Sequence, residues 1–61
     1  NVAYRAATRE WLHRVVEERG GDYSLDDLKA AYESRQLELA PDYLTQLRAM
    51  IDAGELPSYR K

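Results

Sequence analysis

The sequence predicts a single all-α domain of three helices. Apolar residues recur at three- and four-residue steps in three stretches, and glycine or proline residues separate these stretches. The 61 residues leave room for one core, because a domain of this size buries only about 60% of the surface that its unfolded chain exposes. We therefore expect a small helical domain of modest stability.

The first predicted helix spans residues 3–19. One stripe of this helix carries its apolar residues, which are Tyr4, Ala7, Trp11, Leu12, Val15 and Val16. Trp11 is the largest apolar side chain in the chain, so we expect it at the centre of the contact between the three helices. Gly20 and Gly21 end the helix, because glycine readily adopts the left-handed backbone conformation that follows a last turn.

The second predicted helix spans residues 24–35 and begins with a capping box. The Ser24 hydroxyl can accept a hydrogen bond from a free amide of the first turn, and Asp27 stands three residues on in the reciprocal position. The residues expected on its buried face are Leu25, Leu28, Ala31 and Tyr32. The alternating residues 37–39 that follow predict either a short extended connector or a single strand-like pairing.

The third predicted helix spans residues 41–53. Pro41 suits its first position, where a missing amide costs nothing. Its inward stripe is predicted to consist of Leu44, Leu47 and Ile51, with Met50 on the flank. Gly54 ends the helix and Pro57 prevents it from resuming.

The net charge of −2 conceals basic ends around an acidic middle. Residues 1–16 carry three arginines and one glutamate, whereas residues 17–55 carry ten acidic and four basic residues. Arg60 and Lys61 make the other end basic. Proteins that bind nucleic acid normally present a positive stripe, because release of counterions from phosphates supplies much of the affinity. Any phosphate contact is therefore expected from the two ends of the chain.

Residue types that carry catalysis or hold cofactors are scarce. The chain has no cysteine and no glycine-rich phosphate loop, and its single histidine, His13, is predicted to be a solvated surface residue. We therefore expect no catalytic, cofactor or metal site and no small-molecule substrate. No apolar run approaches the roughly 20 residues of a membrane span, and no targeting segment is recognisable, so a cytoplasmic location is expected.

Residues 47–56, with the sequence LRAMIDAGEL, form a leucine-rich turn followed by glycine, an acidic residue and leucine. At the end of the third of three helices, this pattern resembles winged-helix DNA-binding domains, which contain a helix-turn-helix. The resemblance implies a regulatory DNA-binding or DNA-associated domain in which residues 41–53 form the reading helix and residues 59–61 begin a truncated wing.

The DNA-binding hypothesis names eight contact residues. Base or groove contacts are expected from Tyr43, Thr45, Gln46 and Arg48, and phosphate contacts from Arg5, Arg9, Arg60 and Lys61. Glutamine and arginine can form paired hydrogen bonds with adenine and guanine, respectively. A structural alternative stays open for these residues: Thr45 and Gln46 as ordinary solvated positions, and Arg48 in an ion pair with Asp52 four residues on.

The second hypothesis is a non-enzymatic helical module that binds another protein or self-associates. Five tyrosines in 61 residues favour it, because tyrosine is enriched at the centres of protein interfaces. Tyr4, Tyr43 and Tyr59 are expected to remain partly exposed, and Met50 would contribute with them. The two hypotheses differ in geometry, because DNA binding requires the basic ends to lie beside the outward face of residues 41–53.

Overall fold

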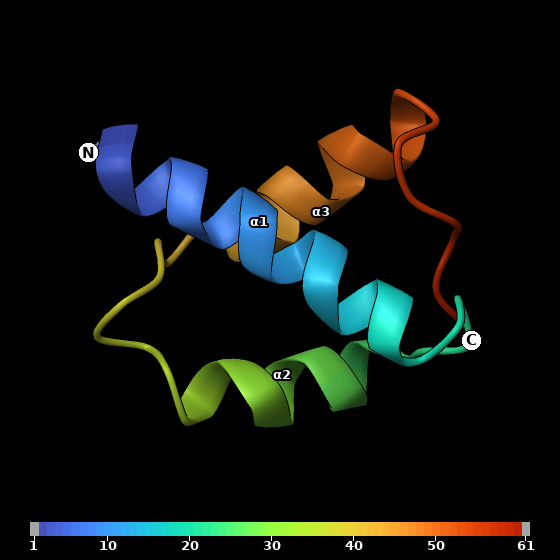
Figure 1. Ribbon diagram of the computed structural model, residues 1–61, viewed down its shortest axis with the longest axis horizontal. Helices are drawn as coiled ribbons and strands as arrows, with labels where there is room; N and C mark the ends of the chain where they lie inside the picture. The colour runs from blue at the N-terminus through green and yellow to red at the C-terminus, as the bar shows by residue number, and fades with distance from the viewer. Residues whose placement is uncertain (1, 61) are drawn as a thin grey trace.

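The structure, a computed structural model, describes residues 2–60 as three helices, α1 (Val2–Glu18), α2 (Leu25–Glu33) and α3 (Tyr43–Asp52). α1 crosses the middle of the molecule between α3 and α2, and the connector of residues 34–42 runs along one end (Figure 1). The all-α class and the order of the helices are those that the sequence predicts. None of the described helices combines the length and the apolar character needed to cross a membrane.

The core forms where the three helices meet the segment after α3. Its buried apolar side chains are Trp11, Leu12, Val16, Tyr23, Leu28, Leu39, Tyr43, Leu47, Met50 and Leu56. The Trp11 ring meets Tyr32 of α2 and Tyr43 of α3 edge-on, with ring centroids 6.4 and 6.1 Å away. Tyr32 and Tyr43 stack on each other with centroids 3.9 Å apart. Trp11 therefore lies at the contact between all three helices, as predicted.

The inward face of α3 is rotated relative to the sequence prediction. Tyr43, Leu47 and Met50 are buried, whereas Leu44, predicted to point inward, is 45% exposed. Stacking of the Tyr43 ring within the aromatic cluster explains this rotation, since an aromatic ring buries more apolar area than leucine. α3 also begins later than predicted, because Pro41 lies in a turn two residues before Tyr43.

The predicted apolar stripes of α1 and α2 also need correction. Ala7 and Leu25 are exposed, whereas Thr8, which apolar spacing did not single out, is fully buried. The Thr8 hydroxyl donates a hydrogen bond to the Tyr4 carbonyl at 2.7 Å and accepts one from the Ala40 amide at 2.7 Å. A polar residue can occupy this buried position because both hydrogen bonds of its hydroxyl are satisfied.

Local sequence signals set three of the helix ends. The capping box forms as predicted: the Asp27 amide donates to the Ser24 hydroxyl at 3.2 Å, and the Ser24 amide donates to the Asp27 carboxylate at 3.1 Å. Gly20 follows α1 and Gly54 follows α3 with φ of +64° and +80°, values that favour glycine. Residues 37 and 38 lie in turns and residue 39 in a bend, so neither the extended connector nor the strand-like pairing is observed there.

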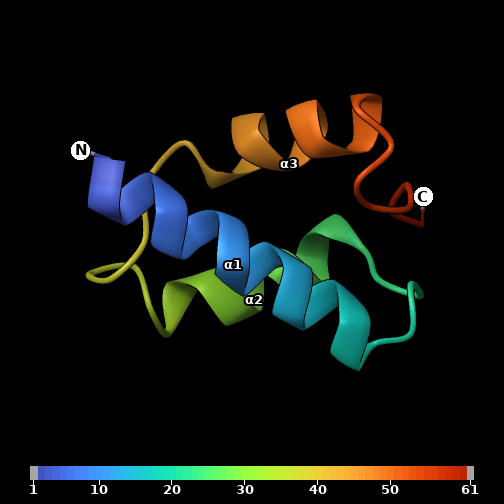
Figure 2. The same ribbon diagram turned by 45° about the horizontal axis from the view of Figure 1, so that its top comes forward.

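The segment after α3 returns to the loop between α1 and α2. The Tyr23 hydroxyl donates to the Pro57 carbonyl, and the Arg60 amide donates to the Tyr23 carbonyl at 2.7 Å. Ser24 and Arg60 form a single parallel bridge, and no hairpin exists within residues 2–60. Figure 2 shows this segment running back from the end of α3. Lys61, the last residue of the predicted wing, lies outside the described residues.

Candidate functional site

The outward face of α3 carries three of the four predicted base-reading residues, and the fourth is buried. Thr45 and Arg48 are exposed, and Gln46 is half-buried. Tyr43 was predicted to be partly exposed, but only 7% of it is accessible because its ring packs against Trp11 and Tyr32. Tyr43 therefore offers little surface to a DNA groove.

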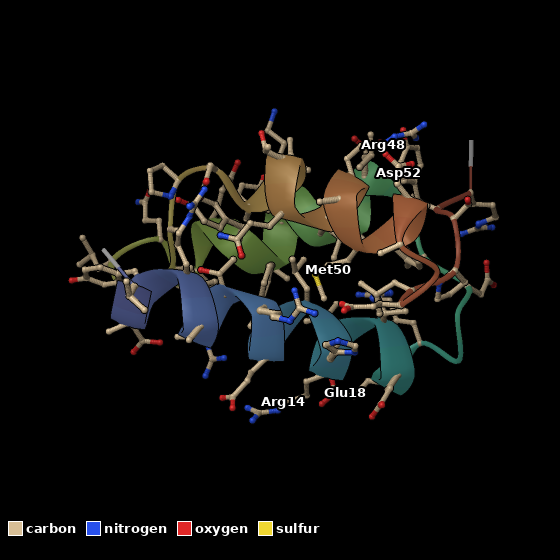
Figure 3. The ribbon with its side chains drawn as sticks, turned by 90° about the horizontal axis from the view of Figure 1, so that it is seen from above. Arg14, Glu18, Arg48, Met50 and Asp52 are labelled. Atoms are coloured by element: carbon tan, nitrogen blue, oxygen red, sulfur yellow. The ribbon has the colours of Figure 1, made fainter. Side chains whose placement is uncertain are left out.

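Polar groups on α3 already bond to carboxylates of the same segment. The Arg48 Nε lies 3.4 Å from the Asp52 Oδ1, and both side chains project from α3 away from α1 (Figure 3). The Gln46 amide donates to the Asp42 Oδ1 at 3.2 Å. The four-residue ion pair of Arg48 is thus the arrangement given by the structural alternative.

Two of the three arginines of α1, Arg5 and Arg9, lie beside α3, as the DNA-binding hypothesis requires, but each meets a carboxylate there. The Arg5 Nη2 lies 2.5 Å from the Asp42 Oδ2, and Arg9 pairs with Glu55. Hydrogen bonds from Arg5 and then from Gln46 hold the pKa of Asp42 below its usual value. Asp42 is therefore ionised at neutral pH and opposes the positive charge of Arg5.

The basic residue near the other end of the chain does not join this group. The Arg60 Nε lies 3.0 Å from the Asp22 Oδ1 in the loop between α1 and α2. The two ends of the described chain lie on opposite sides of the molecule in Figure 1. The expected convergence of both basic ends beside α3 is therefore not observed for residues 2–60.

Ion pairing leaves an acidic surplus on the described surface. Six cations have carboxylate partners within 4 Å: Arg5 with Asp42, Arg9 with Glu55, Arg19 with Asp27, Arg35 with Glu38, Arg48 with Asp52, and Arg60 with Asp22. The ionisable residues of 2–60 outside these pairs, apart from tyrosines and His13, are the cations Arg14 and Lys29 and the acids Glu10, Glu17, Glu18, Asp26 and Glu33. A partner approaching the surface therefore meets more free carboxylates than free cations.

The tyrosines do not form the exposed surface that the interaction hypothesis expected. All five lie within residues 2–60, and only Tyr4, at 47%, is exposed. Tyr43 is buried, Tyr59 is half-buried and Met50 is 2% exposed between α1 and α3 (Figure 3). A binding surface made of Tyr43 and Met50 is thus ruled out by their burial.

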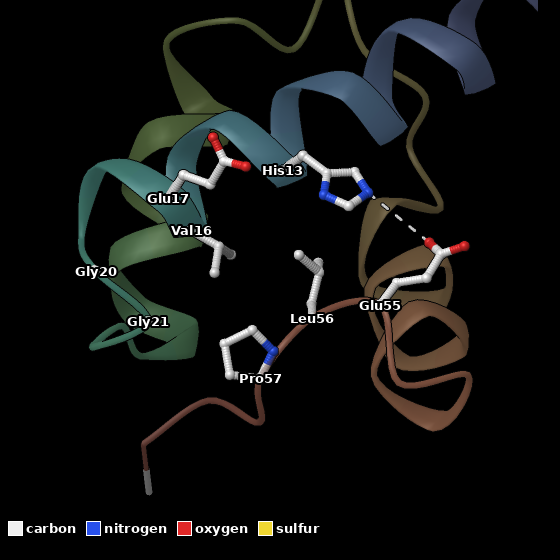
Figure 4. Close-up of a pocket in the computed structure, with 8 residues that line it drawn as sticks. All are labelled: His13, Val16, Glu17, Gly20, Gly21, Glu55, Leu56 and Pro57. Atoms are coloured by element: carbon white, nitrogen blue, oxygen red, sulfur yellow. Dashed lines mark ion pairs between the residues drawn. The ribbon is translucent and has the colours of Figure 1, made fainter.

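A pocket of about 410 Å³ opens between the end of α1 and the segment after α3 (Figure 4). Its lining residues are His13, Val16, Glu17, Gly20, Gly21, Glu55, Leu56 and Pro57. His13 and Glu17 project from α1 on one side, and Glu55 stands on the other side. The His13 Nε2 lies 3.8 Å from the Glu55 Oε2, and the His13 side chain is 40% exposed.

Sequence reasoning did not bring these pocket residues together. Gly20, Gly21 and Pro57 were identified only as signals that end helices, and their proximity depends on the return of the chain toward Tyr23. A Cβ on Gly21 would stand 3.5 Å from the Pro57 Cγ, which shows how closely the two segments approach. No local pattern encodes a contact across that distance in the chain.

Metal ligands do not cluster in this pocket. Within residues 2–60, no group of three or more histidine, cysteine, aspartate and glutamate side chains is arranged to hold a metal ion.

Comparison of the chain with protein-family models, with curated proteins and with solved structures gives no match. The charges and the pocket of this molecule are therefore the features that bear on its function.

Proposed function

We propose that this chain is a non-enzymatic helical module that binds another protein, and that the surface of this partner is basic. The observation that supports the proposal is the acidic surplus left by ion pairing among residues 2–60. Complementary charge speeds association and selects partners, so a surface with free carboxylates favours a positively charged protein.

The same observation argues against DNA as the partner. Affinity for DNA depends on cations that neutralise phosphates and release counterions. Arg5, Arg9, Arg48 and Arg60 are the predicted cationic contacts among the described residues, and each lies within 4 Å of a carboxylate. A phosphate approaching any of them would also approach that carboxylate, and the repulsion would offset much of the attraction.

Titration with labelled random-sequence duplex DNA separates the two functions. We expect no saturable change of fluorescence anisotropy at micromolar protein, even at low salt. Tight binding that weakens steeply as salt rises would instead support DNA binding, and Arg48→Ala should then reduce it. We expect Arg48→Ala to fold normally, because the ion pair between Arg48 and Asp52 is exposed and contributes little to stability.

Selection from a library of short random peptides tests protein binding directly. The folded chain, immobilised by one end, should enrich peptides that carry lysine or arginine, and their affinity should fall as salt screens the charges. Enrichment of acidic peptides, or of none while a known peptide-binding domain succeeds in parallel, would contradict the proposal.

A further inference from the structure

We infer that the pocket between the end of α1 and residues 55–57 receives a lysine or arginine side chain of the partner protein. The inference depends on the proposed function for the existence of that partner. It concerns one depression of about 410 Å³, a size within the range of ligand pockets and ample for one basic side chain.

The walls of the pocket suit the alkyl stem of such a side chain. Pro57 is exposed and offers an apolar ring at the edge (Figure 4), and Val16 and Leu56 line the pocket from core positions that are only 2% and 7% exposed. Gly20 leaves the end of the pocket open, since a Cβ built there would meet nothing within 4 Å. Lysine and arginine commonly bury their methylene groups along apolar surface of this kind while their charge stays in water.

The charges around the pocket identify Glu17 as the partner of the incoming cation. Glu55 already faces Arg9 and His13, with its two carboxylate oxygens directed to different partners. Glu17 lines the same pocket and has no cationic partner among residues 2–60. An ammonium or guanidinium group that enters along the apolar wall would therefore pair with Glu17.

An acidic ligand would find no free cation in this pocket. Arg9 is engaged by Glu55, and His13 faces the same carboxylate. Glu17 would repel an anion at the pocket mouth. Both the apolar wall and the free carboxylate are thus matched by one occupant, a basic side chain with an aliphatic stem.

Nuclear magnetic resonance titration with small probes tests the pocket without the partner. Nα-acetyl-lysine methylamide and Nα-acetyl-arginine methylamide should shift the resonances of Val16, Gly20, Gly21 and Leu56 in a saturable way at millimolar concentration. The matched neutral probe, Nα-acetyl-norleucine methylamide, retains the alkyl stem and should bind more weakly. Equal affinity for the charged and neutral probes would refute the role of charge.

Two neighbouring variants locate the charge that matters. Glu17→Gln should weaken binding of the lysine probe by up to about fivefold, the effect expected of one solvent-exposed ion pair. Glu18→Gln is the matched control, because Glu18 is also an exposed glutamate of α1 but does not line the pocket (Figures 3 and 4). Equal effects of the two variants would show general attraction and would overturn the inference. Both positions are exposed, so both variants should fold.

The peptide selection keeps the two proposals separable. Enriched basic peptides that bind Glu17→Gln and Glu18→Gln equally well would retain the interaction function and eliminate the pocket as its site. A lysine probe that shifts the pocket residues in a Glu17-dependent way, together with a failed peptide selection, would retain the pocket and eliminate the proposed function.

Discussion

The Thr8 hydroxyl provides a sharp test of how α1 is joined to the connector before α3. It accepts a hydrogen bond from the Ala40 amide, 32 residues away in the sequence, within a fully buried position. Thr8→Val keeps the shape of the side chain and its branching, and removes the hydroxyl. The Ala40 amide would then be buried without an acceptor, which costs about 1–3 kcal/mol of the free energy of unfolding.

A loss of this size is readily measured in a domain of 61 residues. Each kcal/mol lowers the midpoint of thermal unfolding by about 4–8 °C in a small domain, so circular dichroism should detect the Thr8→Val variant. Thr45→Val is the matched control, because it makes the same replacement at a threonine that is exposed on α3. Its free energy of unfolding should change by less than about 0.5 kcal/mol.

Amide hydrogen exchange identifies the cause of any loss. Thr8→Ser retains the hydroxyl, so the Ala40 amide should stay protected in this variant and exchange faster in Thr8→Val. Equal stability of Thr8→Val and Thr45→Val would contradict this role of the Thr8 hydroxyl. Equally slow exchange of the Ala40 amide in both Thr8 variants would contradict it as well.

Three further predictions concern the core, a helix cap and the response to pH. Trp11→Ala should lower the free energy of unfolding by about 3–5 kcal/mol, enough to abolish cooperative thermal unfolding. A folded variant with an unchanged midpoint of thermal unfolding would contradict the central packing of this ring. Ser24→Ala removes the cap of α2 and should cost about 1 kcal/mol in urea unfolding, an effect that would be absent if the capping box were dispensable. Burial raises the pKa of Tyr23 and Tyr43 above 10, so the folded state retains these protons after the unfolded chain has lost them. The contribution of these two protons to the free energy of unfolding is thus fully present below pH 10 and is lost as the pH rises above it. A free energy of unfolding that stays constant to higher pH would refute this coupling.

Local chemistry explains the parts of the fold that the sequence predicted. The serine and aspartate of the capping box lie three residues apart, so their mutual hydrogen bonds depend on one turn of backbone only. Gly20 and Gly54 end helices through their own φ angles. Trp11 was placed correctly because no other apolar side chain of its size competes for the centre.

The spacing of apolar residues did not determine which face of α3 points into the core. Leu44 and Tyr43 are adjacent, and the stripe that contains Leu47 can be completed by either of them. The choice was made by the stacking of Tyr43 on Tyr32, a residue of another helix. Tertiary packing of an aromatic ring therefore overrode the apolar pattern within the helix.

The candidate site was still less accessible to sequence reasoning, because its electrostatics depend on pairs that are distant in the chain. Arg5 meets Asp42 across 37 residues, and Arg9 meets Glu55 across 46 residues. The sequence has an excess of arginine near its start, but in the folded chain Arg5 and Arg9 face carboxylates. The charge that a partner encounters is set by the residues left over after these pairs form.

The local balance of charge supports the partner class that we propose. Three arginines near the start of the chain suggest attraction to phosphate only while they are counted without their neighbours in space. Once Arg5 and Arg9 face carboxylates, the free charge of α1 is that of Arg14 against Glu10, Glu17 and Glu18. Because the attraction of exposed charges decays over about 8–10 Å in physiological salt, a partner responds to this local balance. A helix that is basic by sequence at its beginning thus presents an acidic surface, which is the reason to seek a basic protein as its partner.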